Sequence, residues 1–133
     1  MARHPHLIPY GFAHLGKSLC WGCIDLLAIY FLIAQLRLPA VTAGIVLMVL
    51  TALNAVSDLA VAFALRGRGA SARVAGRLQI IGSLLVAIAL PLAFSKGPGS
   101  ANSPLVYALV TGGVLRLAYA LLDVPQNALM SLL

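Results

Sequence analysis

Four long apolar runs, separated by short polar breaks, organise this sequence. The runs cover about residues 12–36, 40–65, 78–94 and 105–133. A transmembrane helix needs about 17–25 predominantly apolar residues, and each run meets that length. The breaks are Arg37 with Pro39, a basic loop that closes near Arg77, and a Gly/Pro/Ser-rich turn at 95–104. The pattern predicts a four-helix transmembrane domain over 12–133, preceded by a polar tail at 1–11.

Composition places the chain in a membrane rather than in water. Its mean hydropathy is +1.02, and 9% of its residues are charged, against about 25% in soluble domains. A net charge of +6 suits nucleic acid, but the arginines of one short loop do not make a basic face. We therefore expect an all-α integral membrane protein whose partner is the lipid bilayer and not nucleic acid.

Basic residues are divided unevenly between the two sides of the predicted spans. The side formed by the tail and the second loop carries Arg3, Arg66, Arg68, Arg73 and Arg77. The two opposite loops carry only Arg37 and Lys96. Because lysine and arginine are retained on the cytoplasmic side, this predicts a multi-pass protein with both termini in the cytoplasm. The apolar helices and the high Ala, Leu and Arg content suggest the cell inner (plasma) membrane.

The fourth run contains a stripe of polar residues at helical spacing. Arg116, Tyr119, Asp123 and Asn127 are separated by three, four and four positions, which places them on one face of a helix. The arginine stands two turns before the aspartate and is placed to pair with it. The tyrosine and the asparagine add donors and acceptors that suit a hydroxyl-rich ligand. This stripe is the predicted solute site.

The first and second runs contain further polar residues. Asn54 and Asp58 lie one turn apart on the second run, and Lys17 and Asp25 lie about two turns apart on the first, with Ser18 beside the lysine. Hydrogen bonds between membrane helices contribute about 0.6 kcal/mol each, whereas a carboxylate near a span centre costs roughly 2.5–3.5 kcal/mol. For Asp58 and Asp123 this balance favours a ligand or ion pathway over packing. For Asp25 both interpretations stay open.

Other candidate chemistry is sparse. Cys20 and Cys23 have no second cysteine pair and no nearby histidine pair that would complete a metal site. Trp21 suits either the membrane interface or the inside of the bundle. No nucleophile elbow, phosphate loop or zinc-enzyme spacing is present. We therefore expect no metal, no enzyme activity and no cofactor other than a coupling proton or sodium ion.

Three segments together resemble a known transporter family. They are Y-G-F-A-H-L-G-K at 10–17, L-N-A-V-S-D at 53–58 and Y-A-L-L-D-V-P at 119–125, with the arginine loop between the last two. In this order and spacing they are similar to the amino-terminal third of the glycoside-pentoside-hexuronide:cation symporters, the melibiose-permease-like branch of the major facilitator superfamily. The resemblance covers the chain from Tyr10 onward and implies the first four helices of that fold.

The resemblance implies a role for several of these residues. It places Tyr119 and Asp123 in a sugar site, where the carboxylate accepts hydrogen bonds from sugar hydroxyls, and it places Asp58 in a cation site. The family usually has acids at the positions of Ser18 and Asn54, which are neutral here. With one carboxylate left, a proton carried by Asp58 is the more economical coupling ion than sodium.

Two further departures concern the sugar site. Asn127 stands where the family often has an aromatic residue, which implies a different solute specificity. Arg116 is also unlike the family and is close enough in sequence to neutralise Asp123.

Three functional hypotheses follow. The first is a partial or shortened symporter-like protein, because such transporters rock two six-helix halves around a midplane site and this chain stops after the fourth span, as a truncation does. The second is a non-transporting subunit of a larger membrane complex, which packs through the small-residue faces Gly82-Ser83 and Gly112-Gly113. The third is a small homodimeric exporter with Asp25 as its proton carrier.

Overall fold

Four long helices make up the computed structural model, which describes residues 7–67 and 72–130. Helix α1 spans Leu7–Tyr30 and continues as the π-helical segment η1, Phe31–Gln35; α2 spans Ala40–Gly67, α3 spans Ala72–Ala93 and α4 spans Pro104–Met130. Each is long and apolar enough to cross a membrane. The predicted all-α, four-span membrane protein is confirmed.

Helices α1 and α3 begin well before their apolar runs. Helix α1 starts five residues before position 12, with Pro9 tolerated in its first turn, and α3 starts six residues before position 78, so Arg73 and Arg77 are helical. Hydropathy marks the part of a helix within the hydrocarbon and not its polar ends. Arg3, Arg68 and residues 131–133 of the fourth apolar run lie outside the described residues.

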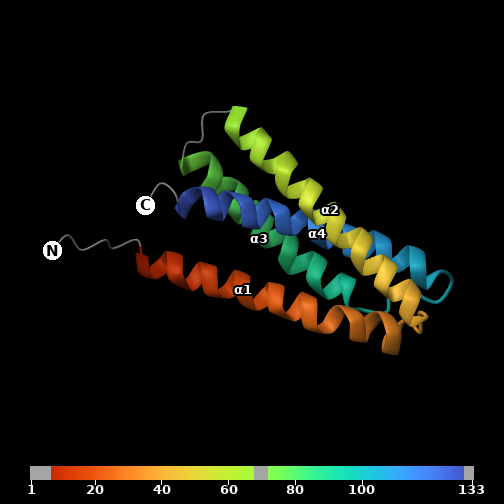
Figure 1. Ribbon diagram of the computed structural model, residues 1–133. Helices are drawn as coiled ribbons and strands as arrows, with labels where there is room; N and C mark the ends of the chain where they lie inside the picture. Colours follow the sequence, from red (N-terminus) through yellow and green to blue (C-terminus); the bar gives the residue numbers. More distant parts are fainter. Residues whose placement is uncertain (1–6, 68–71, 131–133) are drawn as a thin grey trace.

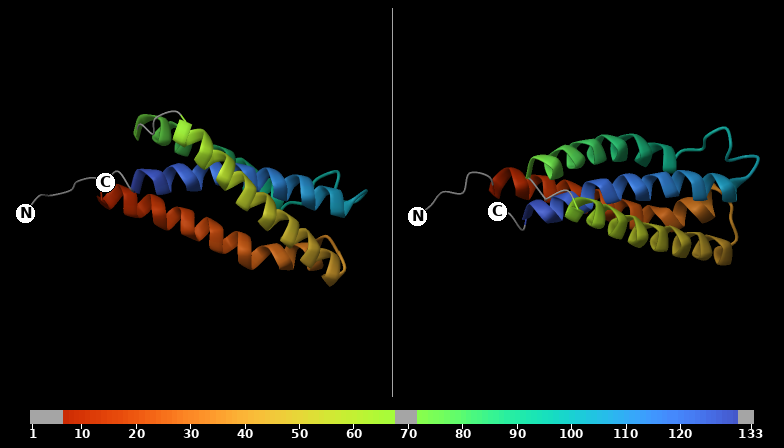
Figure 2. Two further views of the ribbon diagram at one scale, coloured as in Figure 1. Left: turned by 45° about the horizontal axis from the view of Figure 1, so that its top comes forward. Right: turned by 90° about the horizontal axis from the view of Figure 1, so that it is seen from above.

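Helix α4 is the centre of the bundle. Figures 1 and 2 show α4 between α3 and α2, with α1 running along the remaining side. In the most apolar window of each span, 44% of the residues are buried in α4, against 17–22% in the other three. The start of α1, the end of α2, the start of α3 and the end of α4 lie at the same end of the bundle (Figure 1). Polar residues on α4 are therefore placed to meet groups from every other helix.

Small residues bring α3 and α4 together. A Cβ added to Gly82 would lie 2.5 Å from the carbonyl carbon of Leu121 and 2.5 Å from the amide nitrogen of Leu122. One added to Gly112 would meet the side chain of Leu50 on α2 at 2.7 Å. Close approach through glycine is a common way for membrane helices to pack, because lipid gives no hydrophobic drive to associate. Gly82 and Gly112 therefore pack within the chain and do not offer the free faces expected for a subunit partner.

Two short connections reverse the chain at the end opposite the termini. After η1 the chain turns at Arg37, which has a positive φ of 56°, and Leu38 N–H bonds to Leu32 C=O at 3.0 Å. Between α3 and α4, the Tyr107 hydroxyl accepts from Gly97 N–H at 3.1 Å and donates to the Leu92 carbonyl at 2.9 Å. Both connections satisfy backbone groups that a helix end leaves open.

Large apolar side chains cover the outside of the bundle. The exposed ones include Ile8, Leu26, Val41, Met48, Phe63, Ile80, Ile88 and Val110. A monomeric soluble protein does not expose apolar surface on every helix in this way. The surface suits lipid and supports the multi-pass membrane protein that the sequence predicted.

Candidate functional site

An antiparallel ladder of polar and aromatic pairs joins α1 to α4. Lys17 forms an ion pair with Asp123, Trp21 packs on Tyr119 with ring centroids 4.8 Å apart, and Asp25 lies beside Arg116. Along α1 the members follow at intervals of four, and along α4 they follow in reverse at four and three, which keeps each set on one helix face. Charged and aromatic groups thus connect two helices within the apolar bundle.

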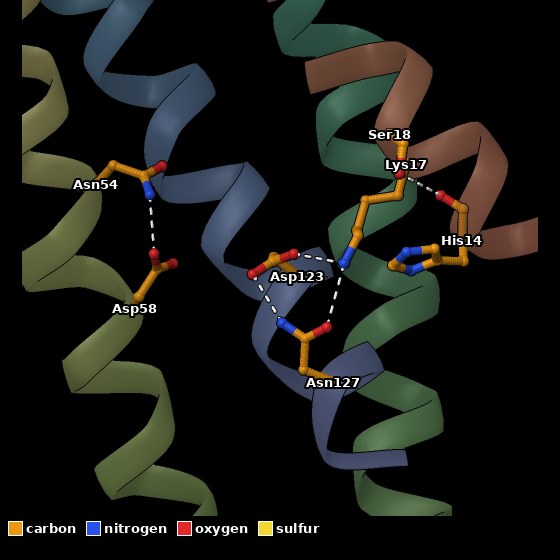
Figure 3. A network of polar contacts seen from close by, with 7 residues as sticks. All are labelled: His14, Lys17, Ser18, Asn54, Asp58, Asp123 and Asn127. Carbon is orange, nitrogen blue, oxygen red and sulfur yellow. Dashed lines mark hydrogen bonds and ion pairs between the residues drawn. The ribbon is translucent and has the colours of Figure 1, made fainter. Parts of the chain in front are cut away.

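Lys17 sits at the centre of a fully bonded polar group. Its Nζ lies 2.7 Å from Asp123 Oδ1 and donates to Asn127 Oδ1 at 3.2 Å, while Asn127 Nδ2 donates to Asp123 Oδ2 at 3.1 Å. Figure 3 shows this triangle, with the lysine reaching from α1 to the two residues of α4. The lysine side chain is 8% exposed and that of the aspartate is 24% exposed. Mutual pairing offsets the cost of both charges inside the span.

Arg116 does not pair with Asp123, so that prediction is wrong. Its Nη2 lies 4.0 Å from Asp25 Oδ1, and its guanidinium carbon lies 4.6 Å from the centroid of the Trp21 ring. Seven helical positions separate an arginine from an aspartate by about 10 Å along the axis. Helix α1 offers nearer partners to both residues, and these partners decide the pairing.

Asn54 and Asp58 form a second polar pair on α2. Asn54 Nδ2 donates to Asp58 Oδ2 at 2.8 Å, as the one-turn spacing predicted. The other oxygens of the two side chains, Asn54 Oδ1 and Asp58 Oδ1, are buried and have no hydrogen-bond partner within residues 7–67 and 72–130. The pair therefore presents two unused acceptors.

A polar cleft of about 370 Å³ lies between these groups. It is lined by His14, Lys17, Ser18, Trp21, Asn54, Asp58, Tyr119 and Asp123, from α1, α2 and α4. Figure 3 shows the Asn54–Asp58 pair on α2 and the Lys17–Asp123–Asn127 group on the other side of the cleft. Two carboxylates and one ammonium group therefore share one hollow among apolar helices.

Most of the predicted site residues gather at this cleft. Asp123, Tyr119, Asp58, Asn54 and Ser18 line it. Asn127 is not part of the lining but bonds to Lys17 and Asp123. Arg116 and Asp25 stand outside the lining, further along the ladder.

Sequence reasoning left three lining residues out of the site. Lys17, Trp21 and His14 all contribute to the cleft. The spacing of four between Lys17, Trp21 and Asp25 was a usable signal, because it places the three on one face of α1. The structure turns Trp21 into the bundle and so decides between its two expected locations.

The cleft offers chemistry for a small polar ligand. Carboxylates and amides accept hydrogen bonds from hydroxyl groups, and the lysine and tyrosine donate to ligand oxygens. Trp21 and Tyr119 add apolar ring surface beside these groups.

Comparisons of the chain with protein-family models, with curated proteins and with solved structures find no match.

Proposed function

We propose that the chain is the solute-binding part of a secondary membrane transporter, similar to the first four helices of a glycoside-pentoside-hexuronide:cation symporter. The observation that carries this proposal is the cleft between α1, α2 and α4, which sets the Lys17–Asp123–Asn127 group against the Asn54–Asp58 pair. Charged residues inside membrane spans are costly, and they mark solute and ion pathways more often than they serve packing.

Asp123, Asn127 and Tyr119 form the solute side of the cleft. The carboxylate and the amide accept hydrogen bonds from solute hydroxyls, and the tyrosine hydroxyl either donates or accepts. Asn127 leaves this side without the aromatic residue common in the family, and Trp21 supplies ring surface from α1 instead. The solute class is a small polyhydroxylated compound such as a sugar.

Asp58 and Asn54 form the cation side. Their two unused oxygens are acceptors for a positively charged group. Since the neighbouring family acids are replaced by Ser18 and Asn54, one carboxylate is available, and a single proton on Asp58 is the coupling ion we propose.

Transport also needs helices that close the open side of the cleft. Transporters of this superfamily form their site at the interface of two repeats, so we propose that further transmembrane helices complete it. We place the chain in the cell inner membrane with the start of α1 and the end of α4 on the cytoplasmic side, because Arg66, Arg73 and Arg77 lie at that end of the bundle and Arg37 and Lys96 at the other.

Binding is the direct test, and it does not need a complete transporter. Trp21 is the only tryptophan of the chain and lines the cleft, so its emission reports occupancy. We expect a glycoside panel titrated into the detergent-solubilised chain to give a saturable change in emission for at least one member. Asp123→Asn should weaken that binding at least tenfold, since it removes a charged acceptor worth about 1.5–3 kcal/mol.

The matched control is Asp25→Asn, which neutralises a carboxylate outside the cleft. It should leave binding unchanged. Where uptake is measurable in vesicles, Asp58→Asn should abolish its dependence on a proton gradient. Unchanged binding in Asp123→Asn together with unchanged uptake in Asp58→Asn would refute the assignment of both sides of the cleft.

A second candidate function is a non-transporting transmembrane subunit. The Asp25 side chain is 52% exposed on a span, and a carboxylate facing lipid is stabilised when a partner helix covers it. Native co-purification of a larger complex, lost in Asp25→Leu and retained in Asp123→Asn, would favour this function. The exporter hypothesis gains less support, because its proton carrier, Asp25, stands beside Arg116 and outside the cleft.

A further inference from the structure

More carboxylates than ammonium groups line the cleft. Two carboxylates, Asp58 and Asp123, and one ammonium group, that of Lys17, line it. The ammonium is bound to Asp123. Within residues 7–67 and 72–130, no basic side chain forms an ion pair with Asp58. With both carboxylates ionised and His14 neutral, one of the two therefore lacks a counter-ion among the side chains that line the cleft.

The Asp58 carboxylate has an acceptor oxygen without a hydrogen-bond donor. One of its oxygens takes the Asn54 amide, while Asp58 Oδ1 and Asn54 Oδ1 are buried and unpartnered. A buried acceptor without a donor is unfavourable, and an unpaired carboxylate within a span is more so. A cationic group that arrives at this pair removes both penalties.

Lys17 has the properties of such a group. A lysine ammonium is a compact charge on a flexible four-carbon stem with three donor hydrogens. Two of those hydrogens serve Asp123 and Asn127. These are the same two side chains that the proposed solute requires, so the lysine and the solute compete for them.

We propose that Lys17 is a tethered counter-ion that is exchanged between Asp123 and Asp58 within the cleft. With the cleft empty it bonds to Asp123 and Asn127, as in this structure. When Asp123 is neutralised or engaged by another ligand, the ammonium moves to Asp58 and Asn54. Lys17 is a positioning residue, since it controls which carboxylate is available.

The exchange has a consequence for coupling that rests on the proposed function. A solute bound to Asp123 displaces the Lys17 ammonium, which then binds Asp58. There the ammonium competes with the coupling proton. Solute and proton then weaken each other's binding, and linkage requires the effect to be equal in both directions. This sign of coupling distinguishes the chain from the symporters it resembles.

The exchange itself is measured without a solute, so it fails or succeeds independently of the proposed function. The chain has two lysines, Lys17 and Lys96, and Lys96 is exposed in the α3–α4 turn. In the full chain labelled with ¹⁵N-lysine and kept in detergent micelles, the Nζ resonance of Lys17 reports its partner, and that of Lys96 is the internal reference.

We expect Asp58→Asn alone to leave the Lys17 resonance unchanged, because the ammonium is already paired with Asp123. Asp123→Asn should shift it, and adding Asp58→Asn to that variant should shift it again, towards the position of Lys96. Asp25→Asn, outside the cleft, should have no effect. The proposal is overturned if Asp123→Asn and the double variant give the same Lys17 resonance.

A second variant keeps the test decisive if Asp123→Asn does not fold. Asp58→Glu retains Asp123 and extends the competing carboxylate by one methylene. It should shift the Lys17 Nζ resonance in proportion to the fraction of molecules in which the ammonium is bound to the carboxylate at position 58. A Lys17 resonance identical in Asp58→Glu and Asp58→Asn would overturn the exchange as well.

Discussion

Replacing Gly82 with alanine should weaken the packing of α3 on α4. The added methyl group would stand 2.5 Å from Leu121 C, 2.5 Å from Leu122 N and 2.7 Å from Leu121 O. All three atoms belong to the α4 backbone, so no side-chain rotation relieves the overlap. One helix has to move away from the other.

The expected loss in free energy of unfolding depends on which atoms the added methyl group contacts. Overpacking a well-packed interior costs about 1–3 kcal/mol, and a backbone obstacle places Gly82→Ala at the upper end. Alanine is more favourable than glycine in a helix by about 1 kcal/mol, which offsets part of this cost. Gly76 lies on the same helix and has nothing within 4 Å of its added Cβ, so Gly76→Ala receives that gain without the overlap. The two variants should differ by about 3 kcal/mol, which is about a hundredfold in the ratio of folded to unfolded protein.

The measurement is reversible unfolding in mixed micelles with increasing denaturing detergent, followed by far-ultraviolet circular dichroism. Gly112→Ala should fall between the two variants, because its added Cβ meets the movable end of the Leu50 side chain at 2.7 Å. Equal stability of Gly82→Ala and Gly76→Ala would refute the close approach of α3 and α4.

Three further predictions use the same unfolding assay. Tyr107→Phe should cost about 0.5–1.5 kcal/mol, because the carbonyl and amide groups of the α3–α4 turn lose their hydroxyl partner; Tyr30→Phe, at an exposed tyrosine, is the control and should be neutral. Arg37→Gly should stabilise the chain by about 1 kcal/mol, because the φ of 56° is strained for any side chain, and a loss of stability would contradict the positive φ. Asp123→Asn combined with Asp58→Asn should cost about 3 kcal/mol, near the lower end for breaking a buried ion pair because Asp123 is 24% exposed, since the Lys17 ammonium then has no carboxylate in the cleft; restoration of stability by the added change Lys17→Met would confirm that the unpaired lysine is the cause.

The sequence by itself determined the features that depend on neighbours along one helix. Apolar length fixed the four spans, since only a helix satisfies its own backbone across a bilayer. The 3.6-residue period placed Tyr119, Asp123 and Asn127 on one face of α4 and brought Asn54 next to Asp58, and the bonds Asn127–Asp123 and Asn54–Asp58 are present. The ends of α1 and α3 were misplaced because polar helix ends leave no hydropathy signal.

Only the tertiary structure decided the contacts between helices. Whether Asp123 binds Arg116 or Lys17 depends on how far α1 slides along α4 and which of its faces turns inward, and no local pattern encodes that register. The packing of α3 on α4 likewise depends on close approaches such as Gly82 on Leu121, which are short-range and specific to one arrangement of backbones. The cleft exists because three helices diverge around a set of residues that the one-dimensional sequence keeps up to 109 positions apart, from His14 to Asp123.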